Sequence, residues 1–152
     1  MKDTSPEVHL SEFLAKYTPE IAALAKAALA KMRARLPGAV QLVYDNYNAL
    51  VVGFGPSERA SEAIFSMAVY PRWVNLFFLR GADLADPQKV LKGSGKVVRH
   101  VVIKDAAVLD SPAIHELMKV ALGDAARHLE STGEGRMVIK SISPKQRPRR
   151  PA

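Results

Sequence analysis

The stretch that decides the fold is residues 40–79, VQLVYDNYNALVVGFGPSERASEAIFSMAVYPRWVNLFFL. It contains four runs rich in β-branched, aromatic and leucine residues, which are Val40–Tyr44, Leu50–Phe54, Ala63–Tyr70 and Trp73–Leu79. Short turn-forming segments separate these runs, whereas a parallel pair of strands needs a crossover of a dozen or more residues. The stretch therefore predicts an antiparallel meander. Its last run is apolar at nearly every position, which favours a central strand with both faces at least partly covered.

Helical patterns flank this stretch on both sides. His9–Tyr17 predicts a short helix, and Thr18–Leu36 and Ser111–Glu130 each predict a longer one that begins with a hydroxyl N-cap followed by proline. Val97–Ile103 supplies a fifth strand. We therefore predict an α+β fold of two layers, with a largely antiparallel five-stranded sheet, two N-terminal helices and one C-terminal helix.

The composition is that of an ordinary globular domain. The chain has 152 residues, of which 48% are hydrophobic and 24% are charged, and it has no cysteine. The lack of cysteine excludes thiol catalysis, thiolate metal sites and disulfides. The apolar runs are much shorter than the roughly 20 residues of a membrane helix, and the N-terminus lacks a signal-peptide pattern. A cytoplasmic location without membrane contact is therefore expected.

The positive charge of the chain is concentrated at its C-terminal end. The formal net charge is +7, and residues 136–152 contain six basic residues and no acidic one. The segment Ser143–Ala152 is rich in proline and lacks large apolar residues. We therefore predict one domain over residues 1–135 and a basic, proline-rich, disordered tail over residues 136–152. Such a tail either contacts nucleic acid or an acidic surface weakly, or serves only as a solubilising terminus.

The segment Lys92–Lys96, with the sequence KGSGK, is a candidate anion-binding loop. Two glycines allow successive backbone N–H groups to point at one anion, and the flanking lysines add positive charge. The spacing is not that of a Walker loop, and the alternative is a flexible polar turn with solvated lysines. The predicted anion-binding residues are Lys92, Gly93, Ser94, Gly95, Lys96, Arg99 and Arg72.

Aromatic residues and arginines lie together around the strand predicted at residues 73–79. Arg72 and Arg80 bracket this strand, and other strand ends carry aromatic side chains, which are Tyr44, Tyr47, Tyr70 and Trp73. Aromatic rings beside arginines can bind a planar or anionic ligand by stacking and charge. The alternative is that these rings form the edges of the core.

The sequence contains no catalytic constellation. Ser94 has His100 six residues away but no third group to orient it, and Glu58 and Glu62 belong to one exposed loop region. Metal-ligand spacing is absent among the four histidines, which are His9, His100, His115 and His128. We therefore predict no enzymatic activity, no metal site and no cofactor.

Residues Val43–Leu79 resemble the YdhG-like family, a domain family of unknown function, and Leu91–His100 is similar to its second signature segment. The resemblance implies a frataxin-like iron-chaperone role as one candidate, because some relatives are described in that way. The leading helices offer only Glu7, Glu12 and Glu20 among several basic residues, whereas hard iron ions need clustered oxygens. We therefore expect a non-catalytic module that binds a small anionic ligand, with iron handling or a protein interaction as the alternative.

Overall fold

The structure is a computed structural model, and it describes residues 5–123, 129 and 135–151. The helices of the described part are α1 (Pro6–Leu14), α2 (Pro19–Arg35) and α3 (Pro112–Leu122). Its strands are β1 (Val40–Asp45), β2 (Leu50–Gly55), β3 (Phe65–Val69), β4 (Val74–Phe78), β5 (Arg99–Val102) and β6 (Met137–Ile142). Short 3₁₀ helices lie at Ala60–Glu62, Gly81–Asp83 and Ala106–Asp110.

The strands form one mixed sheet with the order β5-β4-β3-β2-β1-β6. Strands β1 to β5 form the predicted antiparallel meander, in which each strand pairs with the next along the chain. The sixth strand, β6, pairs with β1 in parallel, so that Gln41 lies opposite Met137. The prediction of an α+β fold is thus confirmed, and the sheet has six strands instead of five.

Strand β6 also contradicts the prediction that residues 136–152 form a disordered tail. Apolar side chains at the start of β6 allow it to cover the edge of β1, which would otherwise stay unpaired. Beyond β6, the segment Ser143–Pro151 runs back along the end of β1, where Arg149 is buried against Asp45. The basic residues of this segment therefore belong to the folded domain.

Helices α2 and α3 begin at the predicted hydroxyl caps, and α1 has a cap of the same kind that was not predicted. The side chains of Ser5, Thr18 and Ser111 each accept a hydrogen bond from a backbone N–H in the first turn, and proline follows each cap. Helix α1 begins at Pro6, three residues before the predicted start at His9. Helix α3 ends at Leu122, and most of the remaining predicted range, up to residue 130, lies outside the described residues. In the described part of the chain, no helix is long and apolar enough to cross a membrane.

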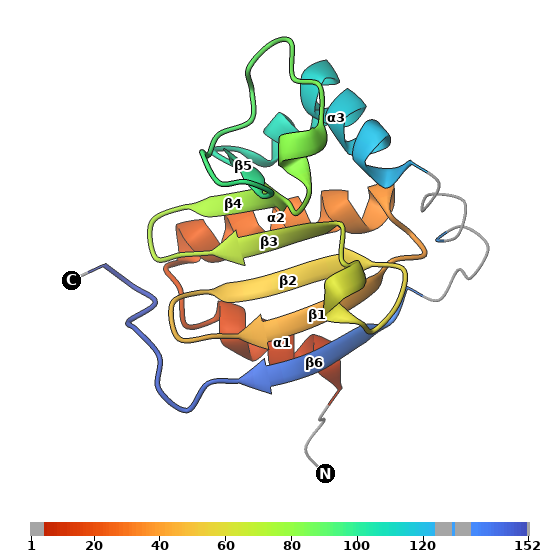
Figure 1. The fold of residues 1–152 in the computed structure, drawn as a ribbon. Coiled ribbons are helices and arrows are strands. Elements are labelled where there is room, and N and C mark those ends of the chain that lie inside the picture. Colours follow the sequence, from red (N-terminus) through yellow and green to blue (C-terminus); the bar gives the residue numbers. More distant parts are fainter. Residues whose placement is uncertain (1–4, 124–128, 130–134, 152) are drawn as a thin grey trace.

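Helices α1 and α2 cover one face of the sheet, as Figure 1 shows behind the strands. The core side chains alternate along the strands, so that Val74, Leu76 and Phe78 of β4 point toward the helices. Asn75 and Phe77 therefore point to the opposite face. That face is open in Figure 1 except at one end, where the short helix Ala60–Glu62 lies in front of the sheet. We call it the open face.

Candidate functional site

The open face carries small side chains at its centre and larger ones around them. Strand register places one row across β1 to β5, namely Leu42, Gly53, Ser66, Phe77 and His100. The adjacent row is Tyr44, Val51, Ala68, Asn75 and Val102. A trough of about 330 Å³ lies over Gly53 and Ser66, between Tyr44 on one side and Ala60 and Ala63 on the other.

Phe77, His100 and Lys92 form the end of the first row. The rings of Phe77 and His100 lie 5.5 Å apart between centroids, with an angle of 45° between their planes. The Lys92 N–H donates to the His100 carbonyl at 2.7 Å, and the His100 N–H donates to the Lys92 carbonyl at 2.9 Å. Residues directly opposite each other in an antiparallel pair project to the same face. An apolar ring, an imidazole and an ammonium group therefore stand side by side at one edge of the open face.

A second pair of stacked rings lies at the other end of β4. The rings of Tyr70 and Trp73 are 5.1 Å apart and 26° from parallel, and Trp73 is 44% exposed. A shallow groove of about 620 Å³ passes Trp73 between β5 and the start of α2. Its charged lining residues are Glu20, Arg72, Lys104 and Asp105.

Two polar atoms of the open face are buried without a hydrogen-bond partner. They are the side-chain oxygen Oδ1 of Asn75, a residue that is only 8% exposed, and the hydroxyl oxygen of Tyr44. Unpartnered buried polar atoms are rare, because each costs about 1–3 kcal/mol. Asn75 and Tyr44 thus have hydrogen-bonding capacity that the described residues do not use.

The cations around β4 and β5 have no acidic partner within residues 5–123, 129 and 135–151. This group consists of Arg72, Arg80, Lys89, Lys92, Lys96, Arg99 and Lys104. Several cations of the helix layer are paired instead, such as Arg33 with Glu7 at 2.7 Å. The carboxylate of Asp86, which lies in the loop before Lys92, accepts the backbone N–H groups of Val90 and Leu91. The loop from β4 to β5 is therefore a region of unmatched positive charge.

The structure separates the residues predicted to bind an anion. Lys92 lies beside His100 on the open face, Gly93 turns the chain at a φ of 120°, and residues 95–97 form an exposed bend. Arg99 lies opposite Phe78, and its guanidinium donates to the carbonyls of Gly95 and Val98. Arg72 lies at the opposite end of β4, in the groove beside Trp73. The KGSGK segment is thus a turn that places one lysine, Lys92, on the open face.

Sequence reasoning missed Asn75 and Phe77, although a signal was present. The run Trp73–Leu79 was predicted to be at least partly covered on both faces, because it is apolar at nearly every position. Asn75 interrupts that run, and strand alternation from Asn75 would have placed Trp73 and Phe77 on the same face as this amide.

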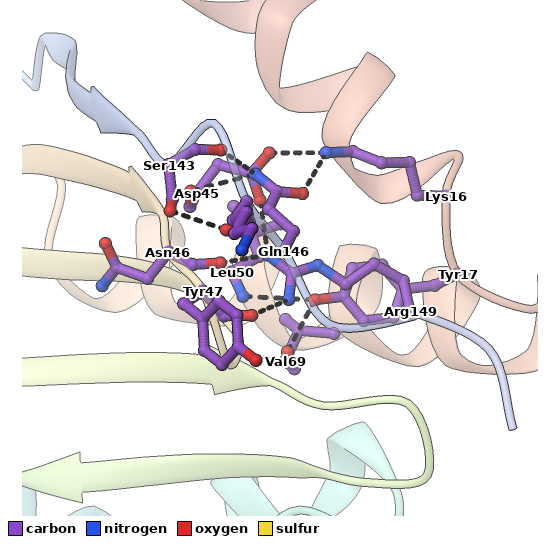
Figure 2. A network of polar contacts seen from close by, with 11 residues as sticks. Lys16, Tyr17, Asp45, Asn46, Tyr47, Leu50, Val69, Ser143, Gln146 and Arg149 are labelled. Carbon is purple, nitrogen blue, oxygen red and sulfur yellow. Dashed lines mark hydrogen bonds and ion pairs between the residues drawn. The ribbon is translucent and has the colours of Figure 1, made fainter.

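A buried polar network joins α1, β1 and the C-terminal segment (Figure 2). Asp45 is fully buried, and its carboxylate lies 2.6 Å from the Lys16 ammonium and 2.9 Å from the Arg149 guanidinium. Arg149 also donates to the carbonyls of Asn46 and Tyr47. Burial acts to raise the pKa of Asp45, but hydrogen bonds from Lys16, Gln146 and Arg149 outweigh it and hold the pKa below its usual range.

Tyr17 completes this network beneath Arg149. Its hydroxyl donates to the Val69 carbonyl at 2.7 Å and accepts the Leu50 N–H at 3.1 Å, and burial raises the pKa of the phenol. The Arg149 guanidinium lies 5.8 Å from the centroid of the Tyr17 ring. One carboxylate thus holds two cations, and these ion pairs anchor the C-terminal segment to α1 and β1.

A further hollow, of about 410 Å³, lies between the end of β4 and α3. Phe78, Leu84 and Val120 contribute to its apolar lining, and its charged residues are Glu62, Arg80 and Asp83. Two carboxylates and one guanidinium make this hollow less favourable for an anion than the open face.

Within the part of the chain that the structure describes, no group of three or more histidine or acidic side chains could hold a metal ion. Comparison of the chain with models of protein families, with curated proteins and with solved structures found no match. The resemblance to the YdhG-like family thus stays a prediction, and the function has to be argued from the site.

Proposed function

We propose that this protein is a non-catalytic binding module for an anionic ligand with a planar ring, which it holds on the open face at Phe77, His100 and Lys92. The single observation that carries the proposal is the row that these three residues form. It combines a stacking surface, a hydrogen-bonding ring and an unpaired cation beside a trough of about 330 Å³.

The chemistry of the row suits the two parts of such a ligand. Phe77 is half-buried, so its ring is held in place by the sheet while part of it is free to stack on a planar group. The Lys92 ammonium has no ion pair among the described residues and can therefore neutralise a phosphate or carboxylate without losing an internal partner. A nucleoside monophosphate carries both chemical parts.

The alternative of iron handling has less support from the described residues. Iron would require clustered carboxylates, whereas Glu7 on α1 is paired with Arg33 on α2. Titration of the protein with ferrous iron is the control experiment for this alternative, and saturable iron binding would support it.

Isothermal titration calorimetry with adenosine monophosphate and with inorganic phosphate, at low salt, tests the proposal. We expect saturable binding of the nucleotide and weaker binding of phosphate, because phosphate cannot stack. Phe77→Ala should weaken nucleotide binding about 2- to 10-fold, which corresponds to the loss of one aromatic pair. Lys92→Ala should weaken the binding of both ligands.

Lys96→Ala is the matched control, because Lys96 is an exposed lysine of the same loop that lies outside the row. We expect it to leave nucleotide binding nearly unchanged. Equal losses from Lys92→Ala and Lys96→Ala would assign the anion to the loop instead of the open face. Absence of saturable binding by the unmodified protein would contradict the proposal.

A further inference from the structure

Strand β4 and Trp73, the residue directly before it, place two aromatic rings along the open face with an amide between them. Trp73, Asn75 and Phe77 occupy alternate positions, so their side chains project to the same side. Each ring is already stacked on a neighbour, Trp73 on Tyr70 and Phe77 on His100. The two stacks are separated by four residues, which is about 13 Å along a strand.

Cations that have no ion pair among the described residues lie near both ends of this row of three side chains. Arg72 and Lys104 line the groove beside Trp73, and Lys92 stands next to His100 at the other end. The groove also contains carboxylates of Glu20 and Asp105, but the Asp105 side chain is engaged, since it accepts the Ala107 N–H at 2.8 Å. The groove at the Trp73 end, which is also lined by residues of α2, therefore holds two cations and two carboxylates, and Lys92 supplies the cation at the other end.

We propose that the open face binds single-stranded nucleic acid along β4, with bases stacked at Trp73 and Phe77 and phosphates directed toward Lys92, Arg72 and Lys104. This inference rests on the proposed function, because the nucleotide held at Phe77 would be one unit of the longer strand. Base stacking on aromatic side chains combined with cations is how proteins bind single strands with little sequence preference. Domains of the RNA-recognition type likewise stack two or three bases on aromatic residues of an open sheet.

Asn75, between Trp73 and Phe77, has a side-chain amide that can form hydrogen bonds with the edge of a base. Its Oδ1 atom has no partner, and its amide lies between the two stacks. An asparagine amide both accepts from and donates to an adenine edge, so rotation of the side chain would turn an unused acceptor toward a base.

The C-terminal segment, which the sequence suggested as the nucleic-acid contact, contributes less charge than predicted. Arg149 is buried on Asp45, and the Arg150 guanidinium donates to the carbonyls of Lys16 and Ala15. Lys145 and Arg147 of the same segment are exposed and have no ion pair among the described residues, so it is the aromatic rings beside the cations, and not charge alone, that favour the open face over the C-terminus.

Fluorescence anisotropy with labelled oligouridylate and oligothymidylate of about eight nucleotides tests the inference on the full chain. We expect both single strands to bind more tightly than adenosine monophosphate. Tighter binding of oligouridylate would identify RNA as the ligand, and tighter binding of oligothymidylate would identify DNA. Binding should also quench the fluorescence of Trp73, the single tryptophan of the chain. With three phosphate contacts, the logarithm of the association constant should fall with the logarithm of salt with a slope of about −2.

Trp73→Ala separates this inference from the proposed function. We expect it to weaken oligonucleotide binding about 5- to 100-fold, the range for loss of one stacked base, and to leave mononucleotide binding at Phe77 unchanged. Tyr47→Ala is the matched control, because Tyr47 is an exposed aromatic residue in the loop between β1 and β2. It should change neither affinity.

The outcomes distinguish the two proposals. If the mononucleotide binds but oligonucleotides bind no tighter, or if Trp73→Ala has no effect on them, the inference is wrong and the proposed function stands. If no ligand binds, both are wrong. If a duplex of the same length binds as tightly as the single strand, attraction by charge alone replaces stacking on β4.

Discussion

The Asp45 network and the open face of β4 use basic residues in opposite ways. In the network, Lys16 and Arg149 surround a fully buried carboxylate, and the guanidinium also donates to two carbonyls. On the open face, Lys92 lies next to aromatic rings and has no ion pair within the described chain. The comparison teaches that a basic residue is available to a ligand only where the fold supplies no carboxylate for it.

The amino-acid composition alone predicts the opposite: it places the cations that are available to a ligand in the C-terminal segment. Residues 136–152 contain no acidic residue, and their composition therefore predicts a free, positively charged tail. Its acidic partner, Asp45, lies about a hundred residues earlier in the chain and meets Arg149 only because β6 pairs with β1. If this difference holds, substitutions in the Asp45 network change stability, whereas substitutions on the open face change ligand binding.

Replacing Asp45 should have the largest effect on stability. Asp45→Ala leaves the buried Arg149 guanidinium without its carboxylate, and loss of one partner of a buried ion pair costs about 3–5 kcal/mol. Urea unfolding followed by far-ultraviolet circular dichroism measures this cost. Asp110→Ala is the control, because Asp110 forms exposed ion pairs with Lys31 and Arg35, and we expect little change. Equal effects of the two variants would contradict the structural role of the network.

Two adjacent phenylalanines on β4, Phe77 and Phe78, provide a test of the open face. Phe78 points into the core and Phe77 to the open face, so Phe78→Ala should cost about 3–5 kcal/mol in unfolding free energy and Phe77→Ala only about 1 kcal/mol. Calorimetric titration of the same variants should show the larger loss of nucleotide affinity for Phe77→Ala. A similar loss of stability in both variants would mean that the open face is covered.

A smaller effect is expected for the hydroxyl group of Tyr17. Tyr17→Phe removes a donor to Val69 and an acceptor for Leu50, and two buried backbone groups lose a partner. We expect a loss of about 1–3 kcal/mol, measured by urea unfolding. An unchanged midpoint would show that water replaces the hydroxyl and that the network is open to solvent.

The pH dependence of stability should give the smallest and most specific signal. The folded protein holds the pKa of Asp45 below its usual value of about 4, so the unfolded chain binds this proton more readily than the folded chain. The stability from Asp45 is therefore complete above the usual pKa and is lost as the pH falls through the lower folded pKa. In urea titrations at several pH values, the difference between the unmodified protein and Asp45→Asn should shrink toward acid. A constant difference would contradict the assignment.

Local signals were sufficient to predict most of the fold. Hydroxyl caps followed by proline marked the starts of α2 and α3, and apolar runs with short turns marked the meander from β1 to β5. Strand β6 was missed because its apolar residues, Met137, Val138 and Ile139, were grouped with the proline-rich segment that follows them. Parallel pairing with β1 depends on residues distant in sequence, and no local pattern identifies that partner.

The candidate site was predicted only in part, for a similar reason. Lys92 and the aromatic residues near Arg72 were recognised as components of ligand binding. The row that joins Lys92 to Phe77 and His100, however, depends on the register of β4 and β5 and on the bridge after Gly93. The side chains on the two faces of a strand such as β4 also differ in burial, and composition alone does not reveal this difference.

The pairing of β6 with β1 has a consequence for how the chain folds. Gln41 and Met137 are separated by about a hundred residues, and contacts between such distant residues carry a large loop-closure cost and slow folding. Until β6 arrives, the edge of β1 exposes unpaired N–H and C=O groups that can template pairing with another chain. The C-terminal strand therefore removes the edge of β1 from the surface at which another chain could pair, and β6 becomes the edge of the sheet in its place.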